Sequence, residues 1–340
     1  MIGTTPRPRT RVAAQAMLGA AAGALTGALV LTLLLGTGAA RAADIGFSAG
    51  IVDGTLRVQG SSAPERIALR LSAGGGQLLI DVGDDGSAER SFDLATFGAI
   101  AVDAGNGDDV VLIDGAFTAT KPTTVAGGNG NDTLLGGGGG ETFVGGRGDD
   151  VADGNGGTDT AFMGSGDDTF VWDPGDGSDR FEGGRGSDTM VFNGAPGNEV
   201  MAANANGDRV RFTRVQGTIV MDLDDVEVID VRALAGTDSI TIGDVGGTDL
   251  RRVDVDLATS LADSRSDGVA DTVTVLGTNG VDTIRASALG AAAAVSGLAA
   301  TVRVFHADPE LDTLVLDSLN GADDVSVDDA LEDLILVSVK

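Results

Sequence analysis

The stretch GGNGNDTLLGGGGGETFVGGRGDDVADGNGGTDTAF, residues 127–162, repeats itself every nine residues. Cut into nines from Gly127, the chain reads GGNGNDTLL, GGGGGETFV, GGRGDDVAD, GNGGTDTAF and MGSGDDTFV without a gap. Two more units, PGDGSDRFE and GGRGSDTMV, follow the inserted pair Trp172 and Asp173, and an earlier unit, AGNGDDVVL, begins out of phase at Ala104. A low-complexity tether has no reason to keep a fixed period, so we expect a repeat architecture here.

Three positions of each unit carry the pattern: the fourth is glycine, the sixth is acidic and the eighth is apolar. Glycine-rich residues favour a tight turn, and the last three residues favour a short strand with one side chain pointing inward. Because two units make one coil, turns 18 residues apart should stack. We therefore expect two rows of acids, the first formed by Asp132, Asp150, Asp168 and Asp188, the second by Glu141, Asp159 and Asp179.

The carboxylates stacked within each row would repel one another. Stacked strands lie about 4.8 Å apart, where two carboxylates repel by roughly 1 kcal/mol in water and about 3–4 kcal/mol at an intermediate dielectric. The core is too thin to compensate, because each turn buries one side chain, and two of these are Ala152 and Ala161. A dication held between turns by carboxylate and carbonyl oxygens would reverse the balance. Calcium suits a flexible all-oxygen site, whereas zinc would require the histidines and cysteines that are scarce here. We expect calcium binding and folding to be one event.

The units resemble the RTX, or haemolysin-type, calcium-binding repeats, whose signature is G-G-x-G-x-D-x-U-x. GGNGNDTLL and GGRGSDTMV fit it at every defined position, and the resemblance extends over residues 104–191. The resemblance implies a parallel β-roll that binds several calcium ions between successive turns. Within the family, the chain is similar to exported members that are known only as calcium-binding proteins. The turn residues expected around the ions are Asp109, Gly128, Gly130, Asp132, Gly137, Gly139, Glu141, Gly146, Gly148, Asp150, Gly157, Asp159, Gly166, Asp168, Gly177, Asp179, Gly184, Gly186 and Asp188.

Several units depart from this signature. Asn155, Met163 and Pro174 each replace a glycine. Glu141 occupies the sixth position, where the other units carry aspartate, and its longer side chain predicts the weakest calcium site.

The flanks on both sides of the repeats favour β-structure. Acids precede alternating strands at Asp238, Asp271 and Asp282, and short alternating segments recur upstream. The predicted fold is all-β: a right-handed parallel β-roll or β-solenoid at 104–191, with longer β rungs at 43–103 and 192–340. The alternative is a roll joined to a separate C-terminal β-sandwich. The alanine-rich segment at 287–302 is interpreted as loop plus strand.

Residues 1–42 have the order of a secretory signal peptide. Arg7, Arg9 and Arg11 form a basic head, residues 12–35 are uncharged and largely apolar, and small residues, Ala40 and Ala42, precede the predicted cut. The alternative is an uncleaved membrane anchor, since an apolar run of this length could span a bilayer. We expect cleavage and secretion, with no membrane span afterwards.

The charge of the chain excludes one class of partner. The formal net charge is −29, and cleavage after Ala42 would leave 18 basic against 51 acidic residues, a charge of −33. Nucleic-acid binding needs a basic stripe, which this sequence lacks, whereas a divalent cation would offset the self-repulsion. Cysteine is absent, so rigidity cannot come from disulfides.

The sequence contains weak signals for catalysis. The segment GFSAG at Gly46–Gly50 matches a nucleophile elbow, but such a serine needs a preceding strand, a following helix and a base, for which His306 is the single histidine. A polysaccharide enzyme would need basic residues, and the candidates are Arg209–Arg214 and Arg251–Arg252. We expect a secreted, non-enzymatic calcium-binding protein. The alternatives are an exported polysaccharide lyase or hydrolase, or a structural surface or matrix protein whose partner is a glycan or another protein.

Overall fold

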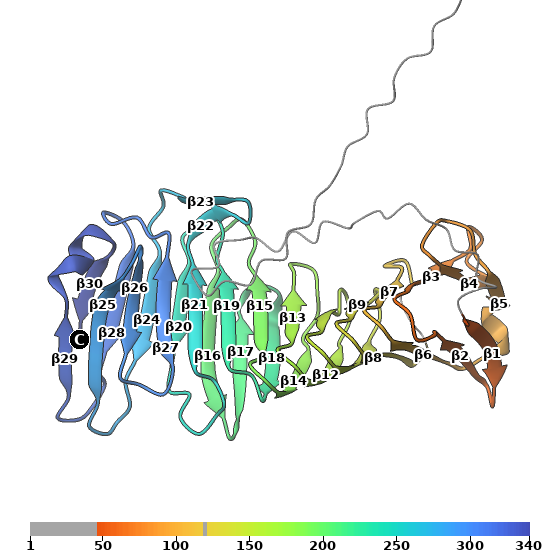
Figure 1. The fold of residues 1–340 in the computed structure, drawn as a ribbon. Helices are drawn as coiled ribbons and strands as arrows, with labels where there is room; N and C mark the ends of the chain where they lie inside the picture. Colours follow the sequence, from red (N-terminus) through yellow and green to blue (C-terminus); the bar gives the residue numbers. More distant parts are fainter. Residues whose placement is uncertain (1–45, 118–120) are drawn as a thin grey trace, which may run out of the picture.

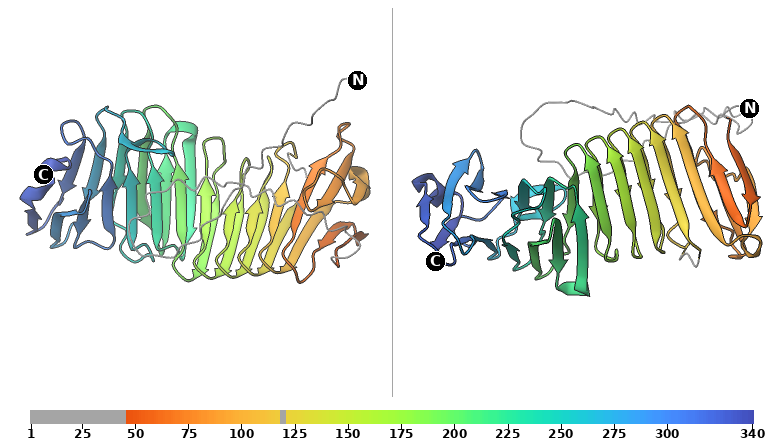
Figure 2. Two further views of the ribbon diagram at one scale, coloured as in Figure 1. Left: turned by 45° about the horizontal axis from the view of Figure 1, so that its top comes forward. Right: turned by 90° about the horizontal axis from the view of Figure 1, so that it is seen from below.

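Two long β-sheets face each other along an elongated molecule in the computed structural model, which describes residues 46–117 and 121–340 (Figure 1). The chain crosses back and forth between the sheets as it advances, which places successive coils side by side (Figure 2). The predicted signal peptide at residues 1–42 lies outside the described residues. The described residues include no helix long and apolar enough to cross a membrane.

The first sheet has 14 strands. In spatial order they are β1 (Ser48–Val52), β2 (Thr55–Gln59), β6 (Ala99–Asn106), β8 (Thr123–Asn129), β10 (Glu141–Arg147), β12 (Thr160–Ser165), β14 (Arg180–Arg185), β18 (Ile219–Asp224), β17 (Arg209–Arg214), β16 (Val200–Asn206), β20 (Ser239–Ile242), β24 (Thr272–Leu276), β28 (Thr313–Asp317) and β30 (Leu336–Val339).

The second sheet also has 14 strands. In spatial order they are β29 (Asp324–Val327), β25 (Thr283–Leu289), β26 (Ala292–Ser296), β27 (Thr301–Phe305), β21 (Arg252–Asp256), β19 (Val228–Arg232), β15 (Thr189–Asn193), β13 (Thr169–Trp172), β11 (Val151–Asp153), β9 (Thr133–Leu135), β7 (Val110–Ile113), β3 (Arg66–Leu71), β4 (Gln77–Val82) and β5 (Arg90–Asp93). A small hairpin and three short 3-10 turns complete the described residues: β22 (Ala258–Ser260), β23 (Asp263–Ser266), η1 (Leu94–Thr96), η2 (Gln216–Thr218) and η3 (Asp329–Asp333).

The nonapeptide repeats form a parallel β-roll, as the resemblance implied. In the second sheet, β9, β11, β13 and β15 pair in parallel and in register, so that Leu134, Ala152, Phe170 and Met190 form one column. These eighth-position side chains are fully buried. The strands of the first sheet are longer than the three residues expected, because β10 runs from the sixth position of one unit into the third position of the next. The core of the roll is one side chain wide per strand.

The region after the repeats continues the same two sheets. The column of the second sheet extends from Met190 through Ile229 and Val253 to Val302. Two antiparallel meanders, β16–β17–β18 and β25–β26–β27, are inserted into the otherwise parallel stack. The molecule is therefore one continuous β-solenoid, in which the alternative of a separate sandwich does not apply. The alanine-rich segment lies in β25, β26 and β27.

Candidate metal centre

The sixth-position acids lie in two rows, one along each edge of the roll. At one edge Asp109, Asp132, Asp150, Asp168 and Asp188 directly precede β7, β9, β11, β13 and β15. At the other edge Glu141 begins β10, while Asp159 and Asp179 directly precede β12 and β14. All eight side chains are buried, with exposed fractions of 0–3%. The structure thus brings together the acids of each predicted row and separates the two rows by the width of the sheets.

One oxygen of each aspartate in the stack joins neighbouring coils. The Oδ1 atom of Asp150 accepts a hydrogen bond from the backbone N–H of Asp132 at 2.8 Å, and Oδ1 of Asp168 accepts one from Asp150 at 2.8 Å. The same bond recurs along both rows at 2.6–2.8 Å, always from the backbone N–H of one acid to Oδ1 of the aspartate one coil later: from Asp109 to Asp132, from Asp168 to Asp188, from Glu141 to Asp159 and from Asp159 to Asp179. The backbone therefore aims every carboxylate at the gap between two turns.

The second oxygen of each acid is buried and has no hydrogen-bond partner. This holds for Oδ2 of Asp109, Asp132, Asp150, Asp159, Asp168, Asp179 and Asp188 and for Oε1 of Glu141. An unsatisfied buried polar group costs free energy, and an unpaired buried charge costs far more. A recurring orphaned carboxylate oxygen is the signature of a missing positive ligand rather than of a packed core.

The space beside these oxygens suits a cation with oxygen ligands. An added Cβ at Gly145 would lie 2.5 Å from Oδ2 of Asp150 and 2.6 Å from the carbonyl oxygen of Met163, which belongs to the next turn. The first-position glycine thus leaves open a cradle that a carboxylate and a main-chain carbonyl both border. Calcium prefers this donor set, since it takes carboxylate and carbonyl oxygens in flexible geometry. When bound, the ion would supply the positive charge that the buried carboxylates lack.

Burial also changes the protonation of these acids. It raises the pKa of Asp150 to about 7 and that of Asp159 to about 8, because the charged form is desolvated and neighbouring carboxylates in the row repel it. The same cause raises the pKa of the others to about 6 or 7: Asp109, Asp132, Glu141, Asp168, Asp179 and Asp188. In the absence of a cation, these carboxylates are therefore partly protonated near neutral pH, and a cation that binds there must displace the protons.

The predicted glycines form the backbone of the turns. At the first edge Gly128, Gly130, Gly146, Gly148, Gly166, Gly184 and Gly186 all have positive φ. A Cβ on any of them would collide with the carbonyl group of the equivalent glycine one coil earlier. Gly157 and Gly177 stack in the same way above Gly139 and Gly157 at the second edge. Gly137 differs, since its nearest neighbours are Ile113 and the loop at Asp114–Phe117.

The departures from the signature are accommodated locally. Asn155 adopts a φ of +53°, which asparagine tolerates, and its Nδ2 donates to the carbonyl of Gly136 at 3.1 Å. Glu141 uses its extra length to fold back, and Oε2 accepts the N–H of Gly137 in its own turn at 3.0 Å. It therefore makes no coil-to-coil bond through its side chain, which distinguishes it from the aspartates.

The sequence did not predict a further row of side chains, which lies on the outer side of the first row of acids. The fifth-position residues Asp108, Asn131, Asp149 and Asp167 each accept the N–H of the next coil's fifth residue at 2.8–2.9 Å. These side chains point toward the following coil, whereas the sixth-position acids point toward the preceding coil. The fifth-position and sixth-position side chains therefore both face the gaps between turns. The charges of Asp149 and Asp167 contribute to the raised pKa of Asp168. The pairs Asp149-Asp150 and Asp167-Asp168 were the available signal, but the repeat pattern, which rests on the fourth, sixth and eighth positions, assigns no role to their first members.

Comparison with protein families agrees with this geometry. The family model described as RTX calcium-binding nonapeptide repeat (4 copies) matches residues 124–140, 135–170 and 174–210. No curated protein matches the chain. Stacked glycine turns, two rows of buried acids and the family match lead to one conclusion: the chain carries RTX calcium-binding nonapeptide repeats folded as a β-roll, and it is a calcium-binding repeat protein.

Proposed function

We propose that this protein is exported, that calcium outside the cell folds its β-roll, and that it has no catalytic activity of its own. The observation that carries the proposal is the set of eight buried carboxylate oxygens without a partner. A roll with so many uncompensated acids and a core one side chain wide has little stability without a cation. Folding and metal binding then occur together, as in other domains whose site exists only in the folded state.

Export supplies the ion. The basic, apolar and small-residue segments of residues 1–42 support a secretory signal. Extracellular calcium-binding modules work with dissociation constants of about 10⁻⁴–10⁻³ M, a concentration range reached outside cells. The chain would therefore remain unfolded and transport-competent inside and would fold on arrival.

The candidate nucleophile and base support a non-enzymatic role. Ser48 begins β1, which turns back into β2 as a hairpin, so the strand-turn-helix context of an elbow is missing at this serine. His306 follows β27 near the other end of the stack, with Nδ1 2.6 Å from Oδ1 of Asp256 (Figure 1). The two side chains cannot act on one substrate.

Two of the candidate arginines, Arg209 and Arg214, form ion pairs with neighbouring acids. Arg209 pairs with Glu182, Asp222 and Asp224 at 2.6–2.8 Å. Arg214 pairs with Glu199, one of the buried acids. These pairings support a role in charge balance rather than in neutralising a uronate.

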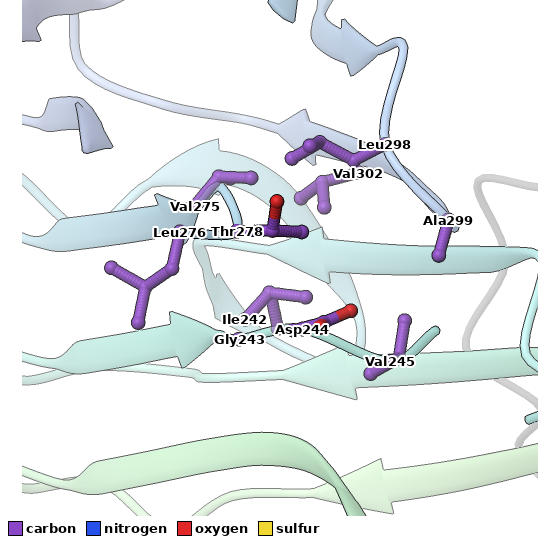
Figure 3. Close-up of a pocket in the computed structure, with 11 residues that line it drawn as sticks. Ile242, Gly243, Asp244, Val245, Val275, Leu276, Thr278, Leu298, Ala299 and Val302 are labelled. Carbon is purple, nitrogen blue, oxygen red and sulfur yellow. The ribbon is translucent and has the colours of Figure 1, made fainter. Parts of the chain in front are cut away.

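A small hollow lies between the sheets in the C-terminal half (Figure 3). Its lining is mainly aliphatic, with Ile242, Val275 and Val302 around it and Asp244 and Thr278 as polar members. Its volume of about 20 Å³ is room for about one water molecule, which is too small for a sugar ring.

Two measurements test the proposal. Circular dichroism of the chain should show a strong β signal with calcium and its loss after chelation, and an equally strong signal in both states would refute calcium-driven folding. Expression in a secreting host, followed by N-terminal analysis of the protein in the medium, should give a chain that begins at Ala43. Recovery of the intact chain in the membrane fraction would instead favour the anchor.

A further inference from the structure

Two carboxylates outside the matched repeats share the unusual state of the repeat acids. Among the described residues, ten buried side-chain oxygen or nitrogen atoms lack a hydrogen-bond partner, and eight of them belong to the sixth-position acids. The other two are Oδ2 of Asp238 and Oδ2 of Asp271. Their side chains are 2% and 1% exposed. Both lie beyond residue 210, where the family match ends.

The backbone around these two acids reproduces the geometry of a repeat turn. Oδ1 of Asp271 accepts the N–H of Asp238 at 2.7 Å, and Oδ1 of Asp238 accepts the N–H of Glu199 at 2.7 Å. Asp238 and Asp271 directly precede the parallel strands β20 and β24. Gly236 has a φ of +148° and is stacked on Gly197, as the fourth-position glycines are in the roll.

The neighbouring acids of the same row are satisfied by groups of the chain itself. Glu199 is held by the guanidinium of Arg214 and by the N–H of Ala195 at 3.1 Å. At the other end Asp312 accepts the N–H groups of Asp271 at 2.8 Å and Asp308 at 2.6 Å. A missing partner is therefore not a general property of acids at this edge. Among the four acids Glu199, Asp238, Asp271 and Asp312, it is confined to the middle two.

A third carboxylate reaches into the same gap. Oδ2 of Asp267 accepts the N–H of Gly236 at 2.8 Å, which bridges the turn before β24 to the turn before β20. Asp238, Asp267 and Asp271 thus bring three negative charges to two adjacent turns. Asp238 and Asp271 are buried and Asp267 is half-buried, so their negative charges are costly unless a cation compensates them.

Another cluster of three acids lacks the combination of burial and an unpartnered oxygen that Asp238 and Asp271 show. Asp224, Asp225 and Asp249 have ligand atoms within 4.8 Å of one another. Asp225 is exposed, however, and Asp224 is paired with Arg209 at 2.8 Å. Solvent and the guanidinium of Arg209 therefore already compensate the charge of this group.

We propose that Asp238 and Asp271 bind a divalent cation between the turns at 233–238 and 266–271, as a site separate from the nonapeptide roll. The donors are oxygen atoms only, so calcium is the ion that fits best. The inference extends the proposed calcium-dependent folding into the C-terminal half, and it does not require the roll itself to be loaded.

Substitution of both acids by asparagine tests the site. In Asp238→Asn/Asp271→Asn the amide oxygen can keep the bond that Oδ1 makes, while two negative charges disappear. We expect the full-length double variant to bind about one calcium ion fewer per chain than the parent, as counted by native mass spectrometry at saturating calcium. The matched control is Asp282→Asn, because Oδ2 of Asp282 already accepts the N–H of Thr278 at 2.6 Å, and this control should bind as many ions as the parent.

The outcomes separate the two proposals. If the parent binds calcium and the asparagine double variant binds the same number of ions, the C-terminal site is refuted while calcium binding by the roll stands. If the parent binds no calcium, the proposed function itself fails. Should the double variant not fold, hydrogen exchange of the parent decides: calcium must slow exchange at 233–238 and 266–271 more than at the turn 278–282, and equal protection would overturn the site.

Discussion

At the scale of the residue, each sixth-position aspartate has two oxygens with opposite roles. Oδ1 of Asp150 accepts an N–H from the preceding coil and fixes the side chain. Oδ2 is buried without a partner and faces the cradle beside Gly145. Oδ1 therefore contributes to the fold, whereas Oδ2 is the atom that we expect to bind calcium, so the two roles can be separated by mutation.

Asp150→Asn should separate them. The amide oxygen can replace Oδ1, so the structure is kept, but the charge that attracts calcium is removed. We expect apparent calcium affinity to fall on the order of tenfold or more, as is typical when a metal site loses a supporting group. The metal-free form should be no less stable than the parent, because one repulsive charge has gone. Calcium titration followed by circular dichroism measures the affinity, and the β signal before calcium is added compares the two metal-free forms. Unchanged affinity would contradict the ligand role.

The glycines of the turns differ in what they tolerate. Gly166 and Gly175 both have positive φ, at +139° and +125°. A Cβ on Gly166 would penetrate the carbonyl of Gly148, whereas a Cβ on Gly175 meets nothing within 4 Å. Gly175→Ala should therefore cost about 1–2 kcal/mol from backbone strain alone. Gly166→Ala should cost about 1–3 kcal/mol more, from overpacking between coils. Urea unfolding at saturating calcium gives both values, and equal costs would show that stacking is not the constraint.

At the scale of the element, periodicity predicted the roll well and the flanks less well. Nine-residue spacing determines which residues stack, so the rows of acids and the core column through Phe170 followed from it. The pairing of β16, β17 and β18 did not, because alternation predicts a strand but not its partner. The two-residue turn Gly207-Asp208 between β16 and β17 was the local signal for that hairpin. The outer row at Asp149 was missed because its direction depends on the turn geometry.

The two rows of a roll should behave as separate units. Asp150 and Asp168 border the same gap, and the backbone N–H of Asp150 donates to Oδ1 of Asp168 at 2.8 Å, while Asp159 lies at the opposite edge. In a double-mutant cycle on unfolding free energy at saturating calcium, the asparagine variants of Asp150 and Asp168 should show a coupling of about 0.5–3 kcal/mol. Asp150 and Asp159 should be additive within about 0.5 kcal/mol. Equal coupling in both pairs would indicate that ions do not bind within single rows.

At the scale of the whole molecule, one side chain can report folding. Trp172 is the single tryptophan and is fully buried. It stacks on Phe192 at 4.1 Å between ring centroids, with Arg214 above its ring at 5.5 Å. This cluster lies where the roll passes into the wider C-terminal solenoid (Figure 1). Its fluorescence therefore follows the junction of the two halves.

The pH dependence of stability should reverse between the metal-free and calcium-bound forms. In the metal-free fold the pKa values of the row acids are raised from an ordinary 3.8 for aspartate to about 6–8, so between pH 4 and pH 8 the folded chain holds more protons than the unfolded chain. The unfolding free energy of the metal-free form must then fall as pH rises through this window. With calcium, the ion displaces those protons, so binding and stability should rise with pH.

Urea unfolding followed by Trp172 fluorescence at pH 5 and pH 8 tests this reversal, with metal-stripped protein and with saturating calcium. The metal-free chain should be unfolded without urea at pH 8 and should require urea to unfold at pH 5, because protons then neutralise the rows in place of the cation. The calcium-bound midpoint should be higher at pH 8. Asp150→Asn/Asp168→Asn provides the control, since loss of two titrating groups should flatten both dependences. Midpoints that move in the same direction with and without calcium would mean that protons and calcium do not compete for the same oxygens.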